Sequence, residues 1–530
     1  MQLVRVEIDG YKHLKHTCVS FNEPGSTDLF QEEIPLRFFI GLNGSGKSVF
    51  LEGICFLFSR IAQNEAPGFA FTLVYRIMRE RMYQVEVRNG QGDEKLSIVV
   101  STEEEGRSWR PHSFDGHREW LPDYVFTCAS GSNNNYFDIM VHSPRTSLYS
   151  DLFDRSLLGK SKRNQEERRQ DVEKLLLSLK SLEENPISMF VDEENSVLVL
   201  AALLSVCPGE AGSEEMTSYL KCRREILGML ERRIEPVLLS LTLDAARTEE
   251  LRDELWQYGA VLAPAYEEAR QQDKESWSTV RLYQDEAIDV ENAHGDRVLS
   301  FLFEPYLKGD RDSFAVGSLS DFYDTPMELL SKLILARNKG IVKEVHMGFH
   351  IEGIEDLLEE NAFSEGEYML LVRLGLLAMG RGGEGSGQCL FLIDEPDVYL
   401  NEHWNIDFVS MIYRIYEGAA RNHEIVIATH SSLILTDAFP NQLYYFRQNQ
   451  GQVQCVNIRA STFGGSRNEI MENLFLTGSS VGTYSYEKIE KILSEVDNIE
   501  KLEACLKYVG SGYLRLRLLD KIQYLRKTEG

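Results

Sequence analysis

The sequence predicts an α/β protein with a mixed sheet, interrupted by a mostly helical insertion and followed by a helical tail. A short apolar run, Leu36–Ile40, ends at a glycine-rich loop and is followed by the strongly apolar helical stretch Val49–Ile61. Two further apolar runs, Cys389–Ile393 and Glu424–Ala428, have the composition of strands buried on both faces of a parallel sheet. Between these parts lies a long segment whose apolar residues recur at helical spacing.

The remaining elements follow from local patterns. Leu3–Asp9 and Val345–His350 alternate apolar and polar residues, which is typical of half-buried strands. Three charged, leucine-bearing stretches predict helices, at 166–182, 213–233 and 248–272, and Val237–Leu241 predicts a strand among them. We therefore divide the chain into an N-terminal part of the main domain (1–146), the insertion (147–340), a C-terminal part of the main domain (341–480) and a helical tail that is a candidate partner-binding segment (481–530).

Composition limits the partners. The 530 residues carry a formal net charge of -27, so the surface repels phosphate backbones and generic coating of nucleic acid is not expected. A local DNA contact stays open, because salt confines electrostatic fields to roughly 10 Å. The candidate basic patch contains Lys160, Lys162, Arg163, Arg168 and Arg169, although the interleaved Glu166 and Glu167 favour a solvated helix face.

Cysteine usage and hydropathy indicate the compartment. None of the eight cysteines forms a C-x-x-C pair, which favours free thiols in a reducing environment. The N-terminus lacks the apolar core of a signal peptide, and the longest apolar run, Val197–Val206, is too short to span a bilayer. We expect a cytoplasmic protein without a membrane segment.

The loop after the first buried strand has the pattern G-x-x-x-x-G-K-S. Glycines let backbone amides turn toward phosphate oxygens, and the following helix adds its dipole. The lysine reaches phosphates, and the serine hydroxyl reaches a magnesium ion. A glycine turn that matches by chance is the alternative, but the strand before and the helix after the loop favour the phosphate site. The predicted phosphate contacts are Gly41, Asn43, Gly44, Ser45, Gly46, Lys47 and Ser48.

A second buried strand ends in two adjacent carboxylates. Asp394 is placed to hold Mg²⁺, and Glu395 is placed to accept a proton from an attacking water. Adjacent carboxylates repel each other unless a cation lies nearby. An acidic turn after a buried strand is the alternative, which the phosphate loop elsewhere in the chain disfavours.

Two shorter motifs flank the carboxylates in the sequence. Phe363–Glu367 precedes an apolar helix, which Ser364 is suited to cap and whose exposed amides suit an anion. Ile427–Ser431 is an apolar strand end that carries His430. Taken alone, the first motif predicts only a helix cap and the second only a structural histidine. Their order along the chain, before and after the carboxylate strand, favours a role for both in the phosphate site.

These four elements, in this order, resemble the ABC ATPase superfamily. Gly41–Ser48 is similar to its Walker A motif, Leu390–Glu395 to Walker B, Phe363–Glu367 to the signature motif, and His430 to the switch histidine. The resemblance implies an ABC-type P-loop head that binds ATP and Mg²⁺ between two copies. It also implies that Ser364 and Gly366 of one copy complete the site of the other, so a homodimer or a higher even oligomer is expected.

The resemblance narrows to the SMC, RecF and OLD branch. The interval from Ser48 to Ser364 holds a whole domain, unlike that of a transporter subunit. Ile8–Lys12 resembles the opening strand of this branch, which implies that Lys12 lies near the phosphates. Val125–Asn133 resembles a strand and Ser-Gly turn of bacterial defence ATPases, at the place of a Q-loop but without its glutamine.

Within this branch the chain is most similar to the PtuA-type ATPases of Septu antiphage systems, which also accompany some retrons. The resemblance implies a separate HNH nuclease as partner, with a reverse transcriptase and its RNA/DNA product where a retron is present. The signature departs from the family at Glu365, where glycine is usual. The chain itself is not expected to cut nucleic acid, because no Asp-x-Asp follows His430 and no HNH pattern is visible.

The expected function is therefore an ATP-hydrolysing subunit of an antiphage complex. Lys47 and Ser48 would bind phosphate and metal, Asp394 the metal, Glu395 the attacking water, and His430 the γ-phosphate. Two alternatives stay open. A DNA repair ATPase similar to RecF or SMC would need a basic groove, which the charge disfavours, and a nucleotide-gated scaffold would bind ATP but hardly hydrolyse it.

Overall fold

The structure is a computed structural model in which the chain forms two compact units, Met1–Phe463 and Gly464–Gly530. It describes residues 1–21, 36–62, 66–90, 96–102, 120–129, 188–191, 193–206, 212–230, 232–244, 279–280, 288–289, 297–303, 314–315, 323, 325–338, 340–354, 356–381, 388–417, 423–458, 462–475 and 482–529. Several predictions lie outside these residues: the helices at 166–182 and 248–272, the basic patch at 160–169, and the Ser-Gly turn at 130–133.

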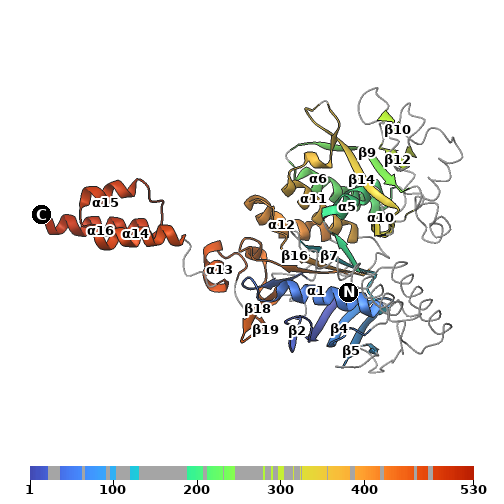
Figure 1. The fold of residues 1–530 in the computed structure, drawn as a ribbon, viewed down its shortest axis with the longest axis horizontal. Coiled ribbons are helices and arrows are strands. Elements are labelled where there is room, and N and C mark those ends of the chain that lie inside the picture. The colour runs from blue at the N-terminus through green and yellow to red at the C-terminus, as the bar shows by residue number, and fades with distance from the viewer. Residues whose placement is uncertain are drawn as a thin grey trace, which may run out of the picture. The chain divides into compact units, whose positions relative to one another are not determined.

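A seven-stranded mixed sheet runs through the first unit in the order β19-β18-β3-β17-β16-β7-β8 (Figure 1). Strands β18 to β8 are parallel to one another, and β19 is antiparallel to β18. The predicted buried parallel strands are thereby confirmed as β3, β16 and β17. The bounds are β3 (Leu36–Ile40), β7 (Tyr124–Ala129), β8 (Ser188–Val191), β16 (Cys389–Asp394), β17 (His423–Ala428), β18 (Leu443–Asn449) and β19 (Gln452–Asn457).

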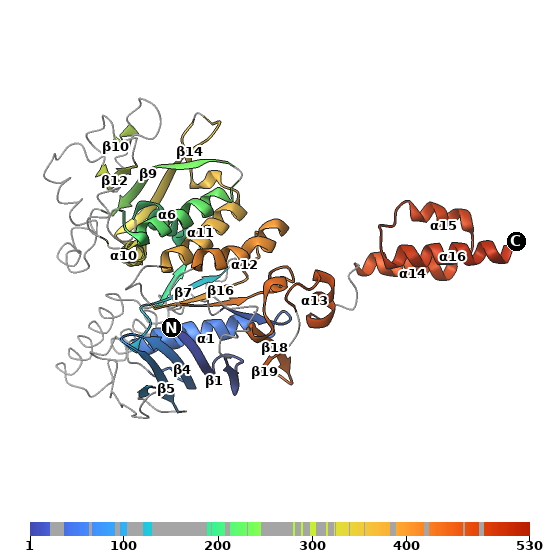
Figure 2. The same cartoon turned by 180° about the vertical axis from the view of Figure 1, so that it is seen from behind.

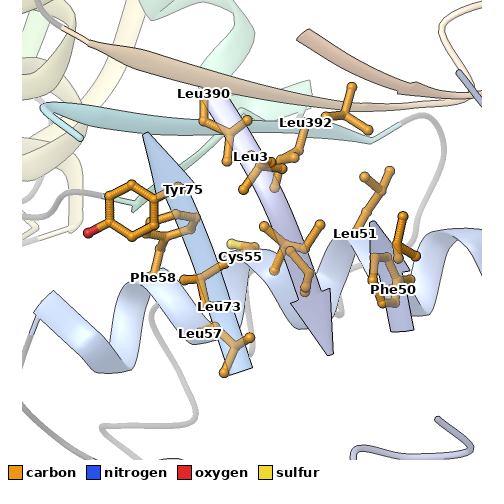
Figure 3. Packing of buried hydrophobic residues seen from close by; sticks show 14 of the residues in the cluster. Leu3, Phe50, Leu51, Cys55, Leu57, Phe58, Leu73, Tyr75, Leu390 and Leu392 are labelled. Carbon is orange, nitrogen blue, oxygen red and sulfur yellow. The ribbon is translucent and has the colours of Figure 1, made fainter. Parts of the chain in front are cut away.

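Helix α1 (Lys47–Ala62) lies between this sheet and a second, antiparallel one. Figure 3 shows Cys55 and Phe58 of α1 near Leu73 of the antiparallel sheet and Phe50 farther along the helix, and all four belong to one buried core with Leu390 of β16. A helix that is apolar on nearly every face needs such cover on both sides. The antiparallel sheet has the order β2-β1-β4-β5-β6, made of β1 (Gln2–Asp9), β2 (Thr17–Ser20), β4 (Ala70–Met78), β5 (Met82–Asn89) and β6 (Ser97–Thr102).

The other face of the central sheet is covered by helices, as Figures 1 and 2 show together. Helix α11 contacts all four of the others, and α5 also contacts α10. The predicted helix at 213–233 and the apolar helix predicted after Phe363–Glu367 are confirmed as α6 and α11. The bounds are α5 (Glu193–Ser205), α6 (Glu214–Gly228), α10 (Pro326–Asn338), α11 (Glu365–Gly380) and α12 (Glu402–Tyr416), with short 3-10 turns η4 (Glu360–Ala362), η5 (Ile434–Asp437) and η6 (Pro440–Gln442).

The described part of the insertion contains strands besides its helices α5, α6 and α10. Strand β8 joins the central sheet, and a third sheet has the order β13-β12-β9-β14-β15. Local periodicity identified β9 and β14 but not their pairing, because partners such as Ser240 and His346 lie 106 positions apart (346 − 240) in the sequence. The strands are β9 (Ile234–Leu243), β12 (Arg297–Leu302), β13 (Phe314–Ala315), β14 (Val342–Ile351) and β15 (Leu358–Glu359), and a separate pair is formed by β10 (Thr279–Val280) and β11 (Ile288–Asp289).

The second unit is helical, as predicted for the tail. It contains α13 (Arg467–Leu474), α14 (Thr483–Glu495), α15 (Ile499–Leu506) and α16 (Tyr513–Glu529). A small core of Leu502, Leu518 and Ile522 joins α15 and α16, and Ile489 and Ile492 of α14 pack against it. None of the helices in the described part of the chain is both long and apolar enough to cross a membrane.

Candidate nucleotide-binding site

The glycine loop between β3 and α1 is held in a conformation that only glycine adopts easily. Gly41 has φ +147°, and a Cβ there would lie 2.2 Å from the carbonyl oxygen of Phe446. Gly46 has φ +101°, and its Cβ would lie 2.8 Å from both γ-methyls of Val453. Ser45 Oγ is buried in the loop without a hydrogen-bond partner in the described part of the chain. The predicted strand, loop and helix are therefore present, with an unsatisfied polar group in the loop.

Lys47 lies at the start of α1 with its ammonium group turned back over the loop. Nζ donates to the carbonyl oxygens of Gly41 at 3.0 Å and Leu42 at 3.4 Å, and lies 2.7 Å from Nε2 of His430. Burial lowers the pKa of Lys47 to about 8, against the opposing influence of Glu395 and Asp394. Among the described residues no carboxylate lies at ion-pair distance from this cation. The partners of this cation in the described part of the chain are therefore neutral groups.

The strand order explains how distant sequence motifs meet. Strand β17 lies between β3 and β16, so all three strands end at one edge of the sheet, beside the loop. Ser48 Oγ donates to Asp394 Oδ1 at 3.1 Å across 346 positions of sequence. Burial raises the pKa of Asp394 to about 6, although the bond from Ser48 opposes this rise. A hydroxyl and a carboxylate at this spacing are oxygen ligands of the kind Mg²⁺ prefers.

Glu395 and His430 face each other at the same edge. Glu395 has φ +50°, an unusual value for a non-glycine residue, and its amide donates to the carbonyl of Ala428 at 2.8 Å. Its Oε1 lies 3.4 Å from His430 Nε2. Burial, with the Lys47 charge, lowers the pKa of His430 to about 4, so the ring is neutral near pH 7. Because an ammonium only donates, Nε2 accepts from Lys47 and the ring proton belongs on Nδ1.

Asp394→Asn should stabilise the nucleotide-free protein above pH 6 while removing hydrolysis. The folded state raises this pKa from 3.8 to about 6, so the folded carboxylate ionises less readily than the unfolded one. The destabilisation is complete above pH 6 and disappears as pH falls toward 4, and it amounts to about 1–3 kcal/mol. Thermal melts with a metal chelator between pH 4.5 and 8 measure it. A gap between wild type and variant that stays constant on acidification contradicts this result.

The turn after Glu395 is fixed by two groups that sequence patterns did not identify. Thr429 Oγ1 donates to Asp397 Oδ1 at 2.6 Å. Arg373, on α11, is buried, and its Nη1 donates to the carbonyls of Pro396 and, at 3.3 Å, Val398. The sequence signal that could have identified Arg373 is its position as the one charged residue in the apolar run Met369–Met379. A buried charge requires partners.

Arg373→Met should lower turnover at least about tenfold and reduce thermal stability, because it leaves two carbonyls of this turn without their donor. The affinity for ATP should change little, since these bonds of Arg373 hold the turn after Glu395. Comparing kcat with the ATP dissociation constant tests this, with the exposed Arg414→Met as the matched control. A loss of ATP affinity equal to the loss of turnover would refute the assignment.

The signature-like motif begins α11 as predicted. Ser364 is its N-cap, and with Glu367 it forms a capping box in which each side chain bonds the other's backbone amide. A Cβ on Gly366 would lie 2.6 Å from the carbonyl oxygen of Tyr399, so only glycine allows this close approach. The motif is thus joined to the turn after Glu395.

Lys12 lies beside the helix that follows the glycine loop. It forms an ion pair with the buried Glu52 of α1, which also accepts from the hydroxyl of Tyr11 at 2.6 Å. The phosphate role of Lys12 stays a prediction.

Comparisons with known proteins give only distant likenesses. No protein-family model matches the chain, and no curated protein matches it. Among solved structures, the SMC head domain from Thermotoga maritima is similar with a TM-score of 0.32 at 9% identity, covering 86% of this chain and 99% of that one. The recombination mediator protein RecF with ATP, of the RecFOR pathway, has a TM-score of 0.27 at 12% identity, covering 86% and 97%. Likenesses at this level do not identify a family.

Proposed function

We propose that this chain binds ATP with Mg²⁺ and hydrolyses it in sites shared between two copies. The observation that carries the proposal is the buried ammonium of Lys47, whose partners among the described residues are carbonyl oxygens and a neutral imidazole. It lies beside a glycine loop with an unsatisfied serine hydroxyl and beside the Ser48–Asp394 pair. A buried cation next to oxygen ligands for a metal suits a polyphosphate bound with Mg²⁺.

The residues present fit these ligands. The loop amides and Lys47 would hold the phosphates, and Ser48 with Asp394 would hold the metal, whose charge lowers the pKa of the Asp394 carboxyl. When bound, Mg²⁺ neutralises charge on the phosphate oxygens. Glu395 accepts a proton from the attacking water; burial raises the pKa of this carboxyl, which brings it nearer to the working pH of a general base. Once Lys47 moves to phosphate, His430 Nε2 loses its donor, and the ring tautomer with its proton on Nε2 can then donate to Glu395 or to the γ-phosphate.

A second copy would complete the site. Ser364 caps α11 at its N-terminus, an end of a helix that suits an anion, and Ser364 is exposed. Leu42 in the glycine loop and Tyr399 after Glu395 are 49% and 39% exposed. Apolar side chains exposed beside a polar site are suited to burial at an interface between copies. The test is turnover per chain against protein concentration, which should rise steeply for a shared site and stay flat for a monomer.

The biological setting is proposed from the resemblance of the motifs to PtuA-type ATPases. In this setting the ATPase controls a separate HNH nuclease in an antiphage complex, with a reverse transcriptase and its product where a retron is present. The second unit, Gly464–Gly530, is the candidate segment for holding the nuclease, since it exposes Tyr508, Tyr513 and Tyr524. The neighbouring genes test this, because an adjacent HNH nuclease supports it and a replication or repair operon contradicts it.

One observation favours a second candidate, a nucleotide-gated scaffold with little hydrolysis. Glu365 places a carboxylate in the first turn of α11, where the γ-phosphate of the other copy would approach. Like charges at this distance weaken binding unless one of them is neutralised. Single-turnover measurement at high protein concentration separates the candidates, because a scaffold keeps its ATP intact.

A further inference from the structure

The segment Glu360–Glu367, here called the signature segment, is tied to the third sheet at both of its ends. At the first end, Glu360 accepts from the Met347 amide at 2.8 Å and lies 3.1 Å from Nδ1 of His346, both on β14. In its middle, the ring of Phe363 packs edge-on against Phe349 of β14, with centroids 5.0 Å apart. Because of these contacts with β14, a shift of the third sheet would also shift the signature segment.

Arg232 holds the other end. It lies two residues before β9, the central strand of the third sheet, and its Nη2 donates to Glu367 Oε2 at 3.0 Å. The same Nη2 lies 3.5 Å from the carbonyl oxygen of Ala362, and the guanidinium lies 5.9 Å from the ring centroid of Phe363. One side chain therefore contacts the signature segment on both sides of its serine, at Ala362 and Phe363 before it and at Glu367 after it.

Glu367 Oε2 collects three donors. Besides Arg232, it accepts from the amide of Ser364 at 2.8 Å and from its hydroxyl at 2.9 Å. Without Arg232, a full negative charge would hold the serine hydroxyl and lie beside Glu365 at the helix N-terminus. Two carboxylates there oppose a polyphosphate, whereas one neutralised by a guanidinium does not.

We propose that Arg232 is a positioning residue, which neutralises Glu367, fixes Ser364 for the nucleotide held by another copy, and couples the third sheet to ATP hydrolysis. This rests on the proposed function. A ligand or partner that displaces β9 relative to α11 changes the reach of Arg232, and with it the competence of the signature segment. The contacts of Arg232 are with the signature segment. Arg232 should therefore affect the association of copies and the turnover of ATP, but not the binding of ATP by its own copy.

The test compares four full-length variants: Arg232→Met, Arg232→Lys, Glu367→Gln and the double variant Arg232→Met/Glu367→Gln. ATP binding at protein concentrations too low for association should stay unchanged in all four. The protein concentration for half-maximal ATPase should rise about tenfold in Arg232→Met and less in Arg232→Lys. Glu367→Gln keeps the capping box, because glutamine also caps, and should restore association to Arg232→Met.

Arg233→Met is the matched control, since its side chain is exposed and pairs with Glu235 at 2.7 Å. An equal effect of Arg233→Met, or failure of Glu367→Gln to restore association, overturns the positioning role. The same holds if Arg232→Met weakens ATP binding at low protein concentration. The proposed function fails separately, through wild-type protein that binds no ATP or through full ATPase in Lys47→Ala.

Discussion

Lys47→Ala should weaken ATP binding about 100-fold or more and remove ATP hydrolysis. A hydrogen bond to a charged group contributes about 1.5–3 kcal/mol, and this ammonium is placed to make more than one of them to phosphate oxygens. Its present partners are carbonyl oxygens and His430, so the nucleotide-free state already holds the side chain over the loop. Titration of a fluorescent ATP analogue measures the affinity, and phosphate release measures the rate.

The variant should fold normally. Burial lowers the pKa of Lys47 to about 8, so the folded state disfavours its charge, and removing the group should not destabilise the nucleotide-free protein. Wild-type affinity for ATP should also fall as pH rises above 8, because the free head loses the proton that the phosphates require; Lys47→Ala should lack this dependence. The exposed Lys491→Ala is the control. Full ATPase in Lys47→Ala, with normal pH dependence, would falsify the phosphate role.

The central part of the fold was accessible to sequence reasoning because its signals are local. Leu36–Ile40 and Cys389–Ile393 are largely apolar runs of strand length; the first leads into the glycine loop and the second into Asp394 and Glu395. Ser364 carried a local capping pattern that the structure confirms in full. Residues whose role depends on their immediate neighbours in sequence were therefore predictable.

The remainder depends on contacts that no local pattern encodes. Arg232 and Glu367 are 135 positions apart, and the third sheet joins strands from distant parts of the chain. The expectation for Lys12 came from resemblance alone, while the structure pairs Lys12 with Glu52, a carboxylate on the covered face of α1. The partners of charged residues are determined by tertiary packing, which the periodicity of apolar residues in the sequence does not describe.

Glu395→Gln should remove hydrolysis while preserving, and even extending, the ATP-bound association of two copies. The amide keeps the size of the side chain but accepts protons poorly, so a step that needs a general base slows by about 100-fold or more. The backbone should tolerate the change, since the φ of +50° is held by the amide bond to Ala428 and not by the carboxylate. Binding groups such as Lys47, Ser48 and Asp394 are left intact.

Chromatography with light scattering, in the presence of ATP and Mg²⁺, should find Glu395→Gln as associated copies. At the same protein concentration wild type should have hydrolysed its ATP and separated. The exposed Glu352→Gln, with the same loss of charge, is the matched control. Normal hydrolysis by Glu395→Gln assigns the base elsewhere. Loss of hydrolysis without longer association would support Glu395 as the general base but contradict the shared site. ATP would then not be held between two copies. If adding Arg232→Met to Glu395→Gln removes this association, the two proposals support each other. Glu395 and the signature segment would then act on one nucleotide from opposite copies.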